Sequence, residues 1–229
     1  MTDTTTSPRP DTPTGTPPGT ISWHDEQVLL GVRVRAFFFD PQLVDARGDW
    51  VARLLPVLSP ALPMPQSLHH DGERGSYKVG DLQALPDAVL VHGNGVLCVS
   101  HRHADKLPHD PERWVRQLRI DLMLQAIVTA MAVSGQRQQP TVALLRCHNA
   151  LYQFDPGPPV LECLATSIGA AKRYAGVSGS ITPQQLAAFC EPRLRELQAP
   201  PGDAAAPRTQ CDSNPFADTT PSDEASVGA

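Results

Sequence analysis

The sequence is poor in aromatic residues, which make up 5% of its 229 residues, and it contains no long uninterrupted apolar run. Its longest apolar stretch, residues 122–133, includes Gln125 and Thr129 and is shorter than the roughly 20 residues that a membrane-spanning helix needs. The N-terminus lacks the basic and apolar segments of a secretory signal. We therefore expect a cytoplasmic protein with an aliphatic core and with no membrane partner.

Closely spaced cysteines are also absent. The five cysteines include no CxxC pair, which argues against a zinc or iron–sulfur site, and they are too few for a disulfide scaffold in a chain of this length. We expect reduced, mostly buried thiols. Positive charge is not in excess either, because 24 acidic residues outnumber 19 basic ones. A general nucleic-acid binder shows the opposite balance, so any contact with DNA requires a local patch.

Proline, in contrast, is abundant, and many of the 24 prolines lie near the two ends of the chain. Residues 1–20 and 199–229 contain little that a core could bury. The two ends also carry the whole net charge of −5, since residues 21–199 hold equal numbers of acidic and basic side chains. This composition predicts a disordered leader over 1–20, one folded domain over 21–198, and a disordered, acidic, proline-rich tail over 199–229.

Two stretches carry clear strand patterns. Residues 28–38 alternate apolar and polar side chains with period two, which predicts one extended segment in which Gly31 marks a bulge. Residues 88–91 and 96–99 are short runs rich in valine on either side of His92-Gly93-Asn94-Gly95. Because Asn-Gly adopts positive φ at low cost, this spacing predicts a β-hairpin.

Three helices are expected, each from its start signal. Asp49 is a candidate N-cap for a helix carrying Trp50. The segment Asp110-Pro111-Glu112 predicts a long helix that runs to about residue 133 and stops at Gly135. Thr182-Pro183-Gln184-Gln185 predicts a last amphipathic helix, which Pro192 kinks or ends.

The remaining elements complete the predicted fold. A polar loop contains residues 69–71, and a weaker strand is expected near residues 77–82. Residues 141–147 form an apolar strand with which residues 149–154 pair back. A buried helix that leads from one strand to the next predicts a parallel crossover behind the hairpin. The fold class is therefore α/β (α+β), with helices packed on a mixed sheet.

Within this order, residues 85–102 read Leu-Pro-Asp-Ala-Val-Leu-Val-His-Gly-Asn-Gly-Val-Leu-Cys-Val-Ser-His-Arg. This segment resembles the core motif of the PD-(D/E)XK nuclease superfamily, and most closely its nuclease-related domain (NERD). That domain has an aspartate at the start of one strand, a turn ending in Gly-Val, and an apolar strand that closes with Glu-x-Lys. The elements expected between residues 46 and 148 are similar to the αβββαβ core. The resemblance implies a restriction-endonuclease-like fold, a nucleic-acid substrate and Mg²⁺ as cofactor.

The sequence departs from this motif at two of its three positions. Asp87 matches the first acid, Ser100 stands where the second acid belongs, and Arg102 stands where the lysine belongs. In the motif, two carboxylates hold Mg²⁺ through oxygen and the metal helps to make a hydroxide. With one of these anions lost, Asp87 is a weak metal ligand. Arg102 can clamp a phosphate but cannot act as a base, so the site is suited to holding phosphate.

Other residues are candidates to compensate for the two losses. Asp81, on the preceding strand, is the best candidate to supply a carboxylate, and Asp105 and Glu112 are alternatives. Lys106 is the candidate to replace the lysine. A protein compensated in this way would remain a Mg²⁺-dependent nuclease, whereas an uncompensated one needs no cofactor.

Structural interpretations stand beside these functional ones. Asp87 follows Pro86 and can cap a turn where a strand starts, while Ser100 and Arg102 can be surface residues at a strand end. Gln117, on the helix where recombination-type relatives carry a glutamine, can serve as a hydrogen-bonded helix residue.

The histidines raise a rival hypothesis. His101, His103 and His109 lie close in sequence to aspartates, and His69-His70-Asp71 forms another cluster. Imidazole and carboxylate groups bind zinc, nickel or copper, but no tight metal-binding spacing such as HExxH is present. Solvated loop histidines account for the pattern more simply.

Three functions follow from these residues. The first is a catalytically silent NERD-like protein that holds nucleic acid in DNA processing or regulation, in a setting such as a plasmid or another mobile element. The second is a non-enzymatic module that binds a protein partner. The third is a divergent Mg²⁺-dependent nuclease.

Overall fold

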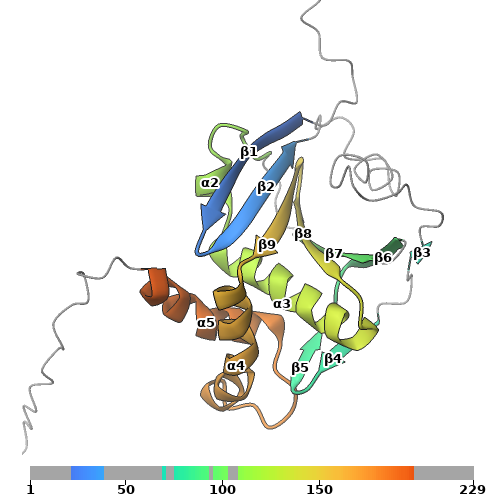
Figure 1. The fold of residues 1–229 in the computed structure, drawn as a ribbon, viewed down its shortest axis with the longest axis vertical. Coiled ribbons are helices and arrows are strands. Elements are labelled where there is room, and N and C mark those ends of the chain that lie inside the picture. The colour runs from blue at the N-terminus through green and yellow to red at the C-terminus, as the bar shows by residue number, and fades with distance from the viewer. Residues whose placement is uncertain (1–21, 39–68, 71–74, 93–94, 103–107, 199–229) are drawn as a thin grey trace, which may run out of the picture. The chain divides into compact units, whose positions relative to one another are not determined.

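The structure, a computed structural model, describes residues 22–38, 69–70, 75–92, 95–102 and 108–198 (Figure 1). In these ranges seven strands form one mixed sheet with the order β1-β2-β9-β8-β7-β6-β3. The strands are β1 (Ser22–Leu29), β2 (Val32–Phe38), β3 (His69–His70), β6 (Ala88–His92), β7 (Gly95–Arg102), β8 (Thr141–Cys147) and β9 (Ala150–Pro156). The mixed sheet with packed helices expected from the sequence is confirmed.

The first two strands form a hairpin. Leu30 and Gly31 make its two-residue turn, with φ of 49° and 74°. Positive φ at both central residues is the geometry whose twist matches that of the flanking strands. The prediction of one continuous strand with a bulge at Gly31 was therefore wrong, because a period-two pattern continues unchanged through so short a turn.

The predicted β6–β7 hairpin is confirmed, with Ala88 opposite Val99 and Val91 opposite Val96. From the end of β7 the chain passes through helix α3 (Ile120–Arg137) and returns in β8. Strand β8 pairs with β7 in parallel, as the crossover requires, and β9 then pairs back antiparallel to β8. This strand–strand–helix–strand unit positions the site described below.

The weak strand expected near residues 77–82 is two short strands. They are β4 (Tyr77–Val79) and β5 (Leu82–Ala84), which pair around the turn at Gly80 and Asp81. They form a separate two-stranded sheet and are not part of the main sheet. Strand β3, within the expected polar loop, occupies the sheet edge beside β6 instead.

The long helix expected from residue 110 is broken. Helix α2 (Trp114–Gln117) is followed by Leu118 and Arg119, which have extended ψ values of 118° and 126°, before α3 begins. Both Trp114 and Leu118 are buried. The helix is interrupted at the second of these buried side chains, and helical start signals alone do not reveal this interruption.

Helix α3 continues past Gly135, where the sequence pattern placed its end, to Arg137. A Cβ atom at position 135 would lie 2.4 Å from Cγ2 of Val79 on β4. Glycine is thus required for close packing of the small sheet against the helix and not for a C-cap.

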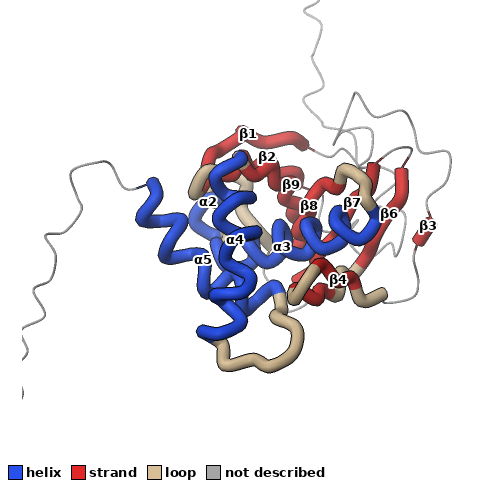
Figure 2. The backbone as a smooth tube through the Cα atoms, turned by 60° about the horizontal axis from the view of Figure 1, so that its bottom comes forward, coloured by secondary structure: helices blue, strands red, loops and turns tan. Residues whose placement is uncertain are grey.

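Two further helices follow the sheet. Helix α4 (Pro158–Tyr174) was not predicted, although prolines in its first turn are a known start signal. Helix α5 (Pro183–Gln198) begins at the predicted capping box and continues through Pro192. Helix α3 packs on β7 and β8, α5 packs on α3, and α4 packs on α5 (Figure 2).

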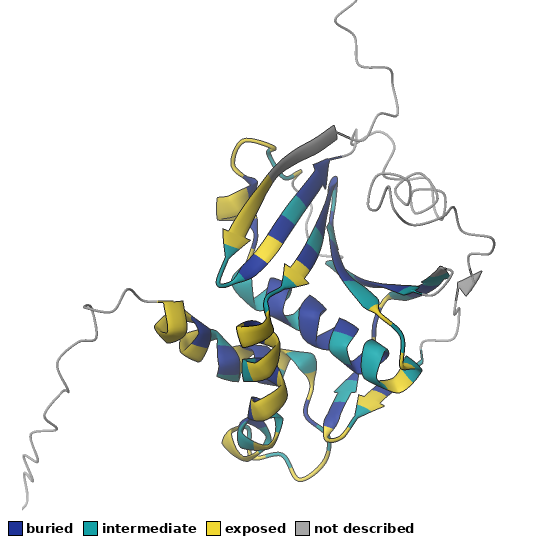
Figure 3. Cartoon of the chain, viewed as in Figure 1, coloured by how far each residue is buried: buried dark blue, intermediate teal, exposed yellow. Residues whose placement is uncertain are grey.

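Both faces of the sheet are buried along its centre (Figure 3). Side chains of β7 alternate between the two faces, so Val96 and Cys98 join the core under α3 while Leu97 and Val99 join a second cluster. That second cluster also contains Phe37, Leu90, Leu144 and Leu151.

Several predictions fall outside the described residues. They are the helix starting at Asp49, the leader over 1–20, and the tail over 199–229, and they stay predictions. Within the described ranges, none of the helices combines the length and the apolar composition of a membrane-spanning segment.

Candidate functional site

Asp87 lies just before β6 and contacts the end of β7. Regular pairing of the two strands ends with Ala88 opposite Val99, and the backbone N–H of Asp87 donates to the carbonyl of Val99 over 3.0 Å, one residue out of that register. Residues two apart on one strand project to the same face, so Ser100 and Arg102 lie on the side of β7 that carries Cys98 under α3. Asp87 lines the same pocket as Ser100, Arg102 and residues of α3, so its side chain lies on that side as well.

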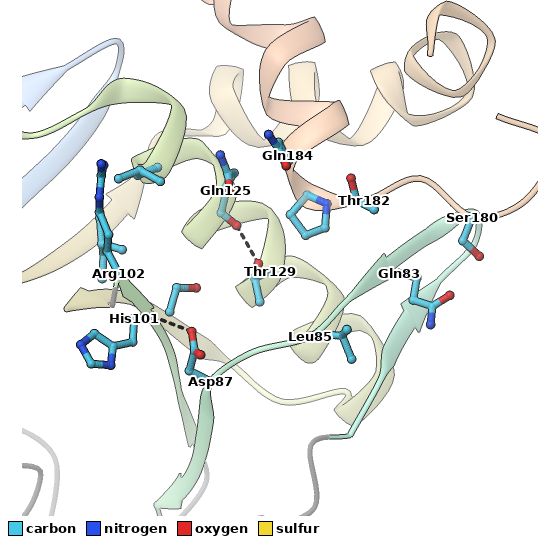
Figure 4. A pocket seen from close by; sticks show the side chains of 14 residues that line it. Gln83, Leu85, Asp87, His101, Arg102, Gln125, Thr129, Ser180, Thr182 and Gln184 are labelled. Carbon is cyan, nitrogen blue, oxygen red and sulfur yellow. Dashed lines mark hydrogen bonds between the residues drawn. The ribbon is translucent and has the colours of Figure 1, made fainter. Parts of the chain in front are cut away.

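These three residues line one pocket of about 740 Å³ at the end of the β6–β7 hairpin (Figure 4). Strand β8 contributes Leu145 beneath them, and helix α3 forms one wall. The pocket is lined by Gln83, Leu85, Asp87, Ser100, His101, Arg102, Leu122, Gln125, Thr129, Leu145, Ser180, Thr182, Pro183 and Gln184.

The Asp87 carboxylate has a structural contact within this site. Its Oδ2 accepts a hydrogen bond of 2.6 Å from the backbone N–H of His101 (Figure 4). This bond ties the start of β6 to the end of β7 and fixes the carboxylate at the mouth of the pocket. This contact joins two strands and is not the turn cap suggested by the sequence, and it is compatible with a role in binding.

A buried thiol lies next to the site on β7. Cys98 lies two residues before Ser100 on the same face of β7 and is fully buried. Burial, and to a lesser extent the charge of Asp87, raise the pKa of the Cys98 thiol to about 12. The thiol therefore stays protonated at neutral pH and contributes no nucleophile to the pocket.

The small number of carboxylates in the pocket limits its capacity to bind a metal ion. Among the described lining residues, Asp87 is the only carboxylate. The described part of the chain also contains no group of three or more histidine, cysteine, aspartate or glutamate side chains placed to hold a metal ion. A Mg²⁺ site built from the described residues would rest on one anion, whereas the cation favours several oxygen ligands in a strict geometry.

The candidates for compensation do not reach this pocket where the structure describes them. Asp81 lies in the β4–β5 turn, and its Oδ1 accepts a hydrogen bond of 2.8 Å from Nζ of Lys172 on α4. Neither Asp81 nor Glu112 lines the pocket. Asp105 and Lys106 lie outside the described residues, so their proposed roles stay predictions.

The remaining candidate residues from the sequence lie partly inside and partly outside the pocket. Gln117 does not line the pocket, and its side chain accepts a 2.8 Å hydrogen bond from the backbone N–H of Asp110. His101 lines the pocket, and His109 contacts the hydroxyl of the buried Tyr152. His103 lies outside the described residues.

Sequence reasoning missed the helical side of the pocket. Leu122, Gln125 and Thr129 are spaced three and four apart on α3, which places them on one face of the helix. That spacing was visible in the sequence as the polar interruptions of an apolar run. Thr182 and Gln184, at the start of α5, reach the pocket only through the packing of α5 on α3, which no local pattern reveals.

Comparisons of the chain with protein-family models, curated proteins and solved structures found no match. The resemblance to NERD therefore rests on the residues of the motif and on the order of the elements that surround it.

Proposed function

We propose that this chain is a catalytically silent, NERD-like domain that holds a nucleic-acid strand by a phosphate. The observation that carries the proposal is the convergence of Asp87, Ser100 and Arg102 on one pocket. These are the three positions of the nuclease motif, and they come from two strands joined by a hairpin.

The order of the elements supports the nuclease-like fold. Strands β6 and β7 form the hairpin that carries the motif, α3 covers it, and β8 returns parallel to β7. Strand β3 pairs antiparallel on the other side of β6, and the separate β4–β5 sheet lies between these two strands in the chain. Apart from that insertion, this order resembles the strand–strand–strand–helix–strand portion of the αβββαβ core.

The chemistry of the pocket favours binding over cleavage. Arginine keeps its charge at every physiological pH and presents a planar fork of donors that fits two phosphate oxygens. Ser100 adds a neutral hydroxyl in place of a carboxylate, which removes a negative charge that would repel phosphate when no metal is bound. The start of α5 also faces the pocket through Gln184, and the positive end of a helix dipole favours an anion there.

Fluorescence anisotropy with a labelled DNA oligonucleotide tests this proposal. We expect salt-sensitive binding, because each neutralised phosphate releases a counterion. Arg102→Ala should weaken binding by about tenfold and reduce the salt slope by about one. Arg102→Lys should recover only part of the loss, since lysine keeps the charge without the planar fork.

Arg195→Ala is the matched control. Arg195 is an exposed arginine on α5 that pairs with Glu191, twelve residues beyond Pro183 at the pocket. Its removal should leave DNA affinity unchanged. Equal losses in both variants, or no DNA binding by the wild-type chain, would refute the proposal. Mg²⁺-dependent cleavage that Asp87→Ala abolishes would show instead that the chain is an active nuclease.

A further inference from the structure

The pocket contains more than the three motif positions. Its remaining lining combines amide side chains with apolar ones, a pairing that phosphate alone does not need. Its volume of about 740 Å³ falls within the range of roughly 300–1,000 Å³ that small-molecule sites occupy. This space is available for a group larger than the phosphate that Arg102 would hold.

Two glutamines supply the amide groups. Gln125 on α3 and Gln184 at the start of α5 both line the pocket, and Figure 4 shows them on the same side of it. Neither side-chain amide makes a hydrogen bond to another described residue. The amides of Gln83 and Gln185, in contrast, bond to Ser76 and Thr182.

An amide that lacks a protein partner offers both a donor and an acceptor to a ligand. The edges of nucleobases present the same two kinds of group side by side, which is why glutamine and asparagine pair with them in two-point contacts. Two such amides in one pocket form a suitable surface for the edge of a base.

The apolar side chains supply a surface for the face of a base. Leu85 is 67% exposed at the pocket rim, directly after strand β5. Leu122 on α3, Leu145 on β8 and Pro183 at the start of α5 form the rest of the apolar lining. Figure 4 shows Leu85 and Gln125 on different sides of the pocket, with Arg102 at one end.

We infer that the pocket binds one unpaired nucleotide, with its phosphate at Arg102, its base edge at Gln125 and Gln184, and its base face against Leu85. This inference rests on the proposed function and specifies its partner as single-stranded nucleic acid. A base in a duplex cannot occupy the pocket, because its pairing edge is already bonded and its faces are stacked. The single-stranded form of a sequence should therefore bind more tightly than the duplex.

The experiment compares a labelled single-stranded oligonucleotide of mixed sequence with its duplex at one salt concentration. We expect the single strand to bind at least tenfold more tightly. Gln125→Leu removes the amide with little change in volume, and it should weaken single-strand binding about tenfold with little effect on duplex binding. Gln184→Ala should act in the same direction. Gln27→Ala, which removes an exposed glutamine on β1, is the matched control and should have no effect.

Circular dichroism on each variant checks that the chain is folded. If Gln125→Leu unfolds the chain, Gln184→Ala carries the test, because Gln184 is exposed in the first turn of its helix. Equal affinity for single strand and duplex, with both weakened by Arg102→Ala, would overturn this inference and leave the proposed function standing. An unchanged single-strand affinity in folded Gln125→Leu and Gln184→Ala would also overturn it. Absence of binding to either DNA would refute the proposed function as well.

Discussion

The Asp87 carboxylate and the backbone N–H of His101 form a 2.6 Å hydrogen bond across the open end of the β6–β7 hairpin. The Asp87 side chain thus has two roles. It extends the pairing of the strands by one contact, and it presents an anion at the mouth of the pocket. The stability of an Asp87 variant must therefore be measured before any change in its binding is interpreted.

We predict that Asp87→Ala lowers the free energy of unfolding by about 1 kcal/mol, because it removes a hydrogen bond to a charged acceptor near the surface. Asp87→Asn retains an acceptor oxygen at the same place and should lose less than half as much. Urea denaturation at neutral pH measures both values. Equal losses in the two variants would show that this hydrogen bond does not contribute to stability.

Position 135 packs so closely against Val79 on β4 that we expect any side chain there to destabilise the fold. Gly135→Ala should lower the free energy of unfolding by about 1–3 kcal/mol through overpacking against Val79, although alanine is intrinsically the better helix former by about 1 kcal/mol. Thermal or urea unfolding provides the measurement.

Val79→Ala makes room for the added methyl group and supplies the control. The double variant should be more stable than the sum of the two single effects predicts, since the two sites are in contact. Simple additivity would mean that Gly135 and Val79 do not pack closely in solution.

The ion pair between Arg119 and Asp121 makes the stability of the α3 N-terminus depend on pH. Its hydrogen bond from Arg119 holds the pKa of the Asp121 carboxyl below its usual value. A carboxyl with a lowered pKa stabilises the fold above its unfolded pKa of about 3.9, and this stabilisation is lost as the pH falls through the lower folded value.

We expect Asp121→Asn to lower the free energy of unfolding by about 0.5 kcal/mol at neutral pH, a small effect because both side chains are partly exposed. The difference from the wild-type chain should disappear in acid once the carboxyl is protonated. Urea denaturation across pH tests this, and a difference that persisted or grew in acid would exclude the assigned cause.

Thr182 caps α5 and thereby sets where Gln184 lies. The Thr182 hydroxyl accepts the Gln185 N–H over 3.3 Å, and the Gln185 side chain accepts the Thr182 N–H over 2.9 Å. Thr182→Ala should lower the free energy of unfolding by about 1 kcal/mol, whereas Thr182→Ser should retain most of the stability. Thermal denaturation compares the two, and similar losses in both would exclude the hydroxyl as the cause.

The sequence was informative where local chemistry decides the structure. The β6–β7 hairpin follows from two valine-rich runs around an Asn-Gly turn, and the α5 start follows from a capping box. The motif positions could be placed on one face because the side-chain period of a strand is two. The sequence alone thus predicts that Ser100 and Arg102 lie on one face, beside Asp87.

The sequence was uninformative where packing between distant segments decides. Gly135 looked like a helix end, but its role depends on Val79, which lies 56 residues earlier in the chain. Gln184 enters the pocket because α5 packs on α3, and the α2–α3 break occurs at Leu118, which is buried in the core. Local propensity contains none of this information.

The most direct test of the central claim restores the missing carboxylate. If Asp87 and Ser100 stand where two acids once held a cation, Ser100→Glu should create a Mg²⁺ site between β6 and β7. We predict that Mg²⁺ raises the Tm of this variant and leaves unchanged both the wild-type Tm and that of a Ser100→Glu/Asp87→Ala double variant. A folded Ser100→Glu variant that shows no Mg²⁺-dependent rise in Tm, or a rise that persists without Asp87, would contradict the account.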